Sequence, residues 1–180
     1  MKTKDLLAPV IAILGAAVVL FGVSVGLGGT AQRNEDAARN EIMSYMLPGR
    51  PVSFTEESYD GEDESIRRIF KAEGGYVLEV ETAGYAGPMV LWVGVTNEGQ
   101  VSGLTVRGHG ETFGLGQRAQ TDASFLLQFL GTEGDAAVGE GIDALTGATV
   151  TSKAVARAVN SAAAFVTGAD ASSSATEWGG

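Results

Sequence analysis

Nine residues near the carboxyl end of the chain, Asp143 to Thr151, combine a carboxylate, a Gly-Ala step and three threonine hydroxyls. A segment with helical spacing of apolar residues follows, and Thr151 or Ser152 is its expected N-cap. Unpaired amides at the start of a helix bind anions, and Gly147 with Ala148 allows a ligand close to the backbone. The segment is therefore typical of a phosphate or phosphoester site, although a capped structural helix after a glycine turn fits the same spacing.

A second candidate segment runs from His109 to Arg118, directly after an expected strand. It offers a carboxylate, a hydroxyl, an apolar side chain and two glycines, supplied by Glu111, Thr112, Leu115, Gly114 and Gly116. A flat aromatic ligand with polar edges would use all of these groups. A polar turn with a solvated histidine is the alternative that the sequence leaves open.

The amino-acid composition excludes several classes of functional site. The chain has no cysteine and a single histidine, which excludes thiolate-bound clusters, disulfides and multi-histidine metal sites. We therefore expect no metal site, and no catalytic residue in the chain itself. The net charge of −10 leaves no basic face of the kind that a nucleic-acid-binding protein needs.

Residues 6–28 are predicted to form a transmembrane anchor. The run from Leu6 to Leu27 contains no charged residue, and as a helix it would extend roughly 33 Å, against about 30 Å for a bilayer core. Lys2 and Lys4 precede it, so the positive-inside rule puts residues 1–5 in the cytoplasm and the rest of the chain outside. A cleaved signal peptide is the competing interpretation.

After the anchor, the pattern predicts an α+β fold with helices packed on an antiparallel sheet. Strand-like runs joined by tight turns occupy Ile66–Ala72 (a strand or a turn), Tyr76–Thr82, Met89–Val95 and Gln100–Val106. Helices are expected over residues 31–47, over Ala123–Leu130 after a Thr121-Asp122 cap, and from Thr151 or Ser152 to Gly168. The expected organisation is a cytoplasmic N-terminus (1–5), the anchor (6–28), a helical and acidic connecting region (29–72), one folded domain (73–168) and a disordered tail (169–180).

Together, the two candidate segments resemble the FMN-binding domain family. Asp143–Thr151 is similar to its covalent-flavinylation motif, and His109–Gly116 is similar to its second signature. The segment Gly84-Tyr85-x-Gly87-Pro88, before a buried strand, adds to the resemblance. Phe113 stands where the family usually has proline, and Thr146 stands where serine is more frequent. With the anchor, the chain looks most similar to G subunits of Rnf electron-transport complexes, and C subunits of sodium-pumping NADH:quinone oxidoreductases are the close alternative.

The resemblance implies one FMN per chain, attached through its phosphate to Thr151 by a flavin transferase that works outside the cytoplasm with FAD as donor. Thr146, Gly147, Ala148 and Thr149 would line the phosphate end of the cofactor. Glu111, Thr112, Gly114 and Leu115 would lie along its isoalloxazine ring.

The function implied is electron transfer within an ion-translocating ferredoxin:NAD⁺ oxidoreductase, so the chain would be enzymatic only as a subunit. Its partners would be the other membrane and soluble subunits, the flavin transferase during maturation, and membrane lipid around a single-pass anchor in the cell membrane. Two alternatives remain open: a free-standing anchored flavoprotein that passes electrons to an extracytoplasmic acceptor, and an anchored binding protein with a bare phosphate site.

Overall fold

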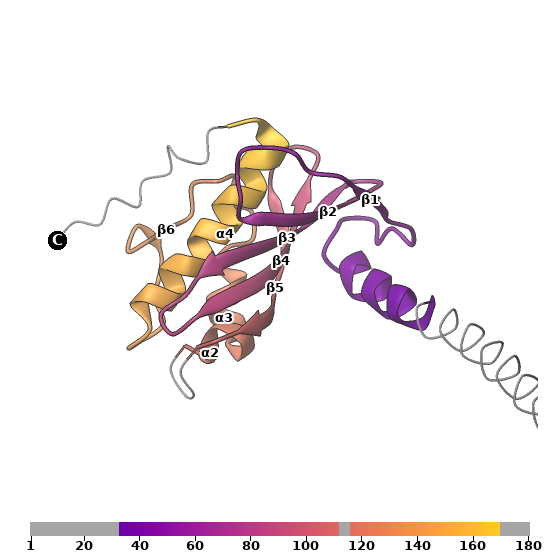
Figure 1. Ribbon diagram of the computed structural model, residues 1–180. Coiled ribbons are helices and arrows are strands. Elements are labelled where there is room, and N and C mark those ends of the chain that lie inside the picture. Colours follow the sequence, from indigo (N-terminus) through magenta and orange to yellow (C-terminus); the bar gives the residue numbers. More distant parts are fainter. Residues whose placement is uncertain (1–32, 112–115, 170–180) are drawn as a thin grey trace, which may run out of the picture. The chain divides into compact units, whose positions relative to one another are not determined.

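The computed structural model describes residues 33–111 and 116–169, and its centre is a five-stranded antiparallel sheet (Figure 1). Each strand pairs with the next strand along the chain, in the order β1-β2-β3-β4-β5. The strands are β1 (Thr55–Glu57), β2 (Ile66–Ala72), β3 (Gly75–Ala83), β4 (Pro88–Thr96) and β5 (Val101–His109). The sheet and the helices packed on it confirm the expected α+β class, and the sheet begins before residue 73, where the folded domain was expected to start.

The helices and two short strands after β5 complete this part of the chain. They are α2 (Arg118–Thr121), α3 (Ala123–Leu127), β6 (Ala137–Val138), β7 (Gly141–Ile142) and α4 (Thr149–Thr167). Strands β6 and β7 pair in parallel, apart from the main sheet. The sequence pattern did not predict β1, α2, β6 or β7, because elements of two to four residues are too short to show a period.

Helix α3 occupies the expected place but has different ends. Asp122 is its N-cap, and the side chain accepts a hydrogen bond from the amide of Phe125. Thr121, which was expected to share the cap, is instead the last residue of α2. The helix ends at Leu127 rather than Leu130, and turns follow it. Helix boundaries are set by local hydrogen bonds that the apolar spacing does not encode.

The chain divides into two compact units, Met1–Asn40 and Glu41–Gly180, and the second contains the sheet with α2 to α4. Residues 33–44 are helical, in agreement with the helix expected over residues 31–47. The anchor predicted over residues 6–28 lies outside the described residues. None of the helices that the structure describes combines the length and the apolar character needed to cross a bilayer.

Strand β4 is an interior strand with both faces buried, as its apolar sequence predicts. Alternate side chains of a strand point to opposite faces. Leu91 and Val93 therefore lie in the main core under α4, and Trp92 lies in a second core on the other face. Helix α4 contacts β3 and β4 with a face made mainly of alanine and valine. These small side chains let the helix lie close to the sheet, as Figure 1 shows, and so fix the position of its first turn.

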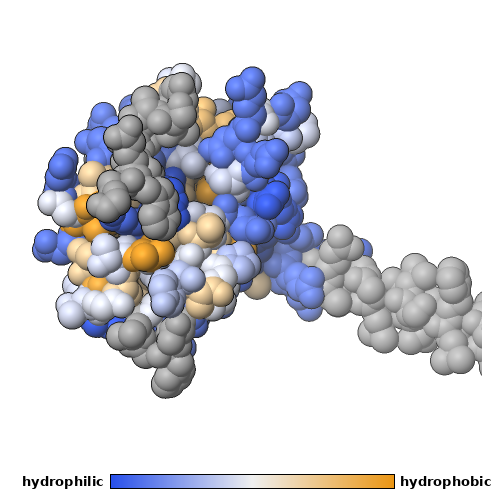
Figure 2. All heavy atoms as spheres, turned by 60° about the vertical axis from the view of Figure 1, so that its left-hand side comes forward, coloured by the Kyte–Doolittle hydropathy of each residue, from blue (hydrophilic) through white to orange (hydrophobic). Residues whose placement is uncertain are grey.

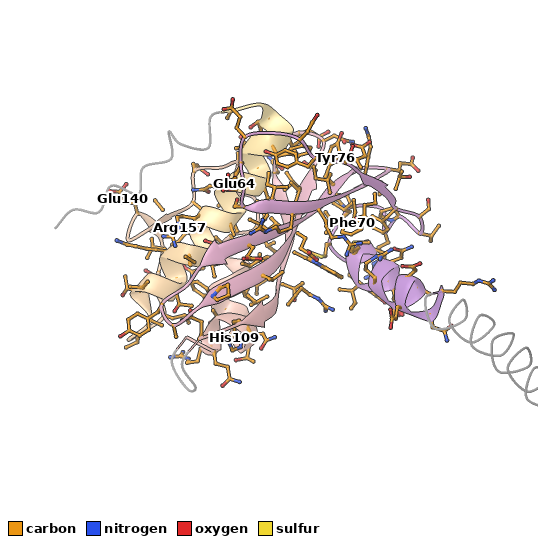
Figure 3. All side chains as sticks on the ribbon, viewed as in Figure 1. Glu64, Phe70, Tyr76, His109, Glu140 and Arg157 are labelled. Carbon is orange, nitrogen blue, oxygen red and sulfur yellow. The ribbon has the colours of Figure 1, made fainter. Side chains whose placement is uncertain are left out.

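The second core covers the sheet face opposite α4. It consists of Met43, Met46, Leu47, Phe70, Val77 and Trp92. Figure 3 shows Phe70 and Tyr76 on neighbouring strands. Phe70 packs in this second core, whereas Tyr76 packs edge-on against Phe165 of α4. The two side chains therefore lie on opposite faces of the sheet.

Paired glycines on β4 and β5 allow the chain around Met46 to lie directly on the sheet. Gly94 and Gly103 are opposite each other in the register, and a Cβ atom on Gly103 would come within 2.6 Å of the Cα of Met46. The register shift beside this pair leaves Ser102 unpaired, and its hydroxyl donates a 2.7 Å hydrogen bond to the carbonyl of Met46. The chain around Met46 is therefore held tightly on the sheet.

The face of the molecule in Figure 2 carries its hydrophobic residues in small areas separated by hydrophilic ones. Among the described residues, the large apolar side chains with notable exposure are Ile42, Tyr45, Val52, Tyr85, Leu127 and Leu130. Scattered apolar residues of this kind are usual on a folded surface.

We predict that Gly103→Ala lowers the free energy of unfolding by about 1–3 kcal/mol, because the added methyl overpacks the contact with Met46. Chemical denaturation of the purified protein measures the change. Gly108→Ala on the same strand is the matched control, since a Cβ there meets nothing within 4 Å, and it should change stability by less than about 1 kcal/mol. Equal losses in both variants would contradict the packing described.

Candidate functional site

A cavity of about 600 Å³ lies where the first turn of α4 meets the chain that follows β5. Its lining residues come from three segments of the chain: Tyr85, Glu111, Gly116, Gly147, Ala148, Thr149, Val150 and Thr151. Five of the predicted site residues are among them: Glu111, Gly147, Ala148, Thr149 and Thr151. The volume is within the range of small-molecule sites, so the cavity is the natural candidate for a ligand.

The other predicted site residues are distributed differently. Thr146 is exposed and is not among the residues that line the cavity. Thr112, Gly114 and Leu115 lie outside the described residues, so their predicted contacts remain predictions.

The first turn of α4 differs from the sequence expectation in its starting point. Ala148 is the N-cap and Thr149 the first helical residue, so neither Thr151 nor Ser152 caps the helix. The reason is Gly147, whose positive φ of 77° turns the chain into the helix earlier than the hydroxyl pattern suggests. Thr151 is consequently the third residue of the helix.

This start of α4 is suited to an anion. The first backbone bond within the helix runs from the amide of Ser152 to the carbonyl of Ala148, at 2.9 Å. The amides of Thr149, Val150 and Thr151 precede it and have no acceptor within the helix, and they lie at the positive end of its dipole. The Ser152 hydroxyl accepts from the amide of Leu145 at 3.0 Å and donates to Ala148, which holds the turn in shape.

Thr151 donates a 2.5 Å hydrogen bond from its hydroxyl to Oε2 of Glu111, forty residues earlier. Both side chains are buried, with 1% of Thr151 and 9% of Glu111 exposed. The other carboxylate oxygen, Oε1, accepts from the amide of Ala86 at 3.3 Å. This contact brings the two predicted motifs together at one point.

Two glycines make room for this carboxylate. A Cβ atom on Gly84 would collide with Oε1 of Glu111, and a Cβ atom on Gly116 would collide with Oε2. Either added carbon would push the carboxylate from its present position beside Thr151. The Gly84 position lies in the Gly-Tyr-x-Gly-Pro segment, which thereby contributes to the site.

His109, whose role the sequence left open, supports the backbone of Glu111. Its Nδ1 accepts a hydrogen bond from the amide of Glu111 at 3.3 Å, so the proton of the neutral ring is on Nε2. Nε2 then donates to Oε1 of Gln120 at 3.2 Å, and Gln120 in turn donates to the carbonyl of Val106. Figure 3 shows His109 at the end of β5, where this chain of bonds begins. The side chain of His109 therefore stabilises the backbone of the loop that carries Glu111.

Asp143 is held through its backbone. Gln128 of the turn after α3 accepts from the Asp143 amide at 2.7 Å and donates to its carbonyl at 3.4 Å. Asp143 itself is exposed and is not among the lining residues. The first residue of the nonapeptide therefore lies apart from the cavity.

Tyr85 is a lining residue that the sequence reasoning did not assign to the site. It is 72% exposed, at the tip of the loop between β3 and β4. The loop is closed by a hydrogen bond from the amide of Gly84 to the carbonyl of Gly87, and Arg157 of α4 donates to the carbonyl of Ala83 at 2.7 Å. The signal that could have found Tyr85 is its place between the glycines of the Gly-Tyr-x-Gly-Pro segment.

Comparison with known proteins relates the part of the chain that lines the cavity to a known family. Residues 84–164 match the FMN-binding domain family, a range that contains every residue lining the cavity. The chain is 41% identical over 99 residues to the G subunit of a proton-translocating ferredoxin:NAD⁺ oxidoreductase complex from Clostridium ljungdahlii, covering 51% of this chain and 53% of the relative. It is 42% identical over 108 residues to the G subunit of an ion-translocating oxidoreductase complex from Pseudomonas aeruginosa, covering 54% and 50%.

A third relative is the G subunit of a Na⁺-translocating ferredoxin:NAD⁺ oxidoreductase complex from Acetobacterium woodii, 35% identical over 95 residues, or 48% of this chain and 46% of the relative. The chain spans about half the length of the curated relatives it matches. Residues 84–164 are therefore similar to the FMN-binding domain family, and about half of the chain is similar to G subunits of ion-translocating oxidoreductase complexes.

Proposed function

We propose that the chain is a membrane-anchored electron-transfer subunit that carries one FMN, bound covalently through a phosphoester to Thr151. The observation that carries this proposal is the position of the Thr151 hydroxyl, which lines a 600 Å³ cavity at the start of α4 and contacts a carboxylate. A phosphate attached there would lie beside the helix amides that have no acceptor within the helix.

The residues around the cavity fit the rest of the cofactor. Gly147 and Ala148 leave the backbone open beside the attachment point, and Thr149 adds a hydroxyl in the first turn. Tyr85 supplies an aromatic ring at the rim, where a flat ring system would find a stacking partner. We also propose that Thr112, Gly114 and Leu115 line the ring, and that Thr146 supports the phosphate end. FMN supplies the electron transfer when bound, and the protein supplies its position and electrostatic surroundings.

The resemblance to G subunits supports an assembly of the same kind. The chain would exchange electrons with other membrane and soluble subunits of an Rnf-type ferredoxin:NAD⁺ oxidoreductase complex. A flavin transferase would load the cofactor from FAD outside the cytoplasm. Residues 6–28 would anchor the chain in the lipid of the cell membrane, with residues 1–5 in the cytoplasm and the domain of residues 73–168 outside.

The attachment residue is tested by Thr151→Ala, produced together with a flavin transferase. We expect this variant to lose all flavin fluorescence from the denatured band on a gel, because Thr151 is the lining threonine, among the described residues, whose hydroxyl contacts Glu111. Thr149→Ala removes an exposed hydroxyl from the same turn and should keep the fluorescent band. Intact-mass spectrometry of the wild type should show the mass of one FMN. A wild-type band without fluorescence would disprove covalent attachment.

The role of Tyr85 is tested by Tyr85→Leu in the flavin-loaded protein. We expect the fluorescence of the native protein to rise several-fold, because a phenol ring stacked on a flavin quenches its emission, while the covalent flavin content stays unchanged. Tyr45→Leu is the matched control, since Tyr45 is 62% exposed and is not among the residues that line the cavity. Unaltered emission from the Tyr85 variant would show that the ring is not stacked on the flavin.

A further inference from the structure

The carboxylate of Glu111 is placed to accept a proton from the hydroxyl of Thr151. The 2.5 Å separation of Oγ1 and Oε2 is at the short end of the range for hydrogen bonds between a hydroxyl and a charged oxygen. A hydroxyl must lose its proton when its oxygen forms a bond to phosphorus. A base within direct hydrogen-bond reach is the first geometric requirement for assisting that loss.

The helix itself does not require this contact. Ser152, the next residue, donates its hydroxyl to the carbonyl of Ala148, four residues back, which is the ordinary uncharged acceptor for a hydroxyl in a helix. Thr151 donates instead to a carboxylate from another segment, around which Gly84 and Gly116 leave space. The fold therefore places a carboxylate, that of Glu111, specifically beside the hydroxyl of Thr151.

Among the residues that the structure describes, none of the ion pairs involves Glu111. Its carboxylate therefore has no cationic partner in that part of the chain. The printed hydrogen bonds of its carboxylate come from the Ala86 amide and from the hydroxyl of Thr151, which lies in the first turn of α4. Burying a carboxylate this way costs stability. The position of the carboxylate beside Thr151 is therefore not explained by an ion pair.

We propose that Glu111 is the base that accepts the Thr151 proton during flavin attachment, an inference that rests on the proposed function. Oγ1 of Thr151 attacks the flavin-bearing phosphorus of FAD, and the bond between Oγ1 and phosphorus forms. The pyrophosphate bond breaks, AMP leaves with the electron pair of the bridging oxygen, and the proton moves to Oε2 of Glu111. Nothing is oxidised or reduced. The neutral acid then avoids repulsion with the negative phosphodiester beside it.

The test follows the rate of flavin attachment by intact-mass spectrometry, with purified protein, FAD and an excess of purified flavin transferase. Glu111→Gln keeps the shape of the side chain but removes the base, and should slow attachment by about 10²-fold or more. Glu79→Gln is the matched control, because Glu79 also accepts a hydrogen bond, from Nε1 of Trp92 at 2.8 Å, but does not line the cavity. It should react at the wild-type rate.

The pH dependence of the attachment rate distinguishes a base from a residue with a purely structural role. The ratio of the wild-type rate to the Glu111→Gln rate should fall as acid protonates the carboxylate, while titrations of the transferase cancel in that ratio. Glu111→Asp keeps a carboxylate and should keep the acid-side decline that Glu111→Gln loses. Circular dichroism checks that each variant is folded, and Glu111→Asp carries the test if the glutamine variant is not.

Failure of this inference can be distinguished from failure of the proposed function. Attachment to Glu111→Gln within tenfold of the wild-type rate, a rate ratio that does not change with pH, or an aspartate variant without the acid-side decline would overturn the inference while the proposed function stands. A wild-type protein that gains no flavin under these conditions would overturn both.

Discussion

Helix α4 packs on β3 and β4 through a face of small side chains, and this contact sets the position of the site. Buried alanines such as Ala154, Ala158 and Ala162 let the helix lie close to the sheet, so that its start is fixed relative to the end of β5. Asn160 adds a polar link, because its side chain both accepts from and donates to the backbone of Ala136 at 3.0 Å. A helix free to slide or rotate would carry Thr151 away from Glu111.

The opposite face of the sheet holds the segment around Met46 in place. Met46 lies on Gly94 and Gly103, where any larger residue would occupy its space, and Ser102 adds a hydrogen bond to its carbonyl. The second core fixes the chain from residue 43 onward on the sheet, at the cost of two strand glycines that contribute no side-chain packing of their own.

The site joins two electrostatic features that are each ordinary when taken separately. The start of α4 presents amides and a positive dipole end, which favour an anion. The Glu111 carboxylate occupies that region through its contact with Thr151, and a phosphate bound there would bring a second negative charge. Two anions in one buried place repel strongly unless one of them is protonated. A phosphate bound at Thr151 would therefore lie beside a carboxylate, and the site would have to accommodate the repulsion between them.

The sequence by itself determined the longer strands and helices of the domain and the two motifs, because apolar periodicity and motif spacing are local properties of a chain. Thr151 was singled out through the resemblance of its motif to a known family. The sequence did not determine the start of α4, which depends on the left-handed turn at Gly147, or the short elements β1, α2, β6 and β7. Only the tertiary structure decided that Glu111 contacts the Thr151 hydroxyl, that His109 braces its backbone, and that Tyr85 lies at the rim. These contacts join segments that are distant in the sequence, forty residues apart for Glu111 and Thr151, and their geometry is set by the packing of α4 on the sheet, which no local pattern records.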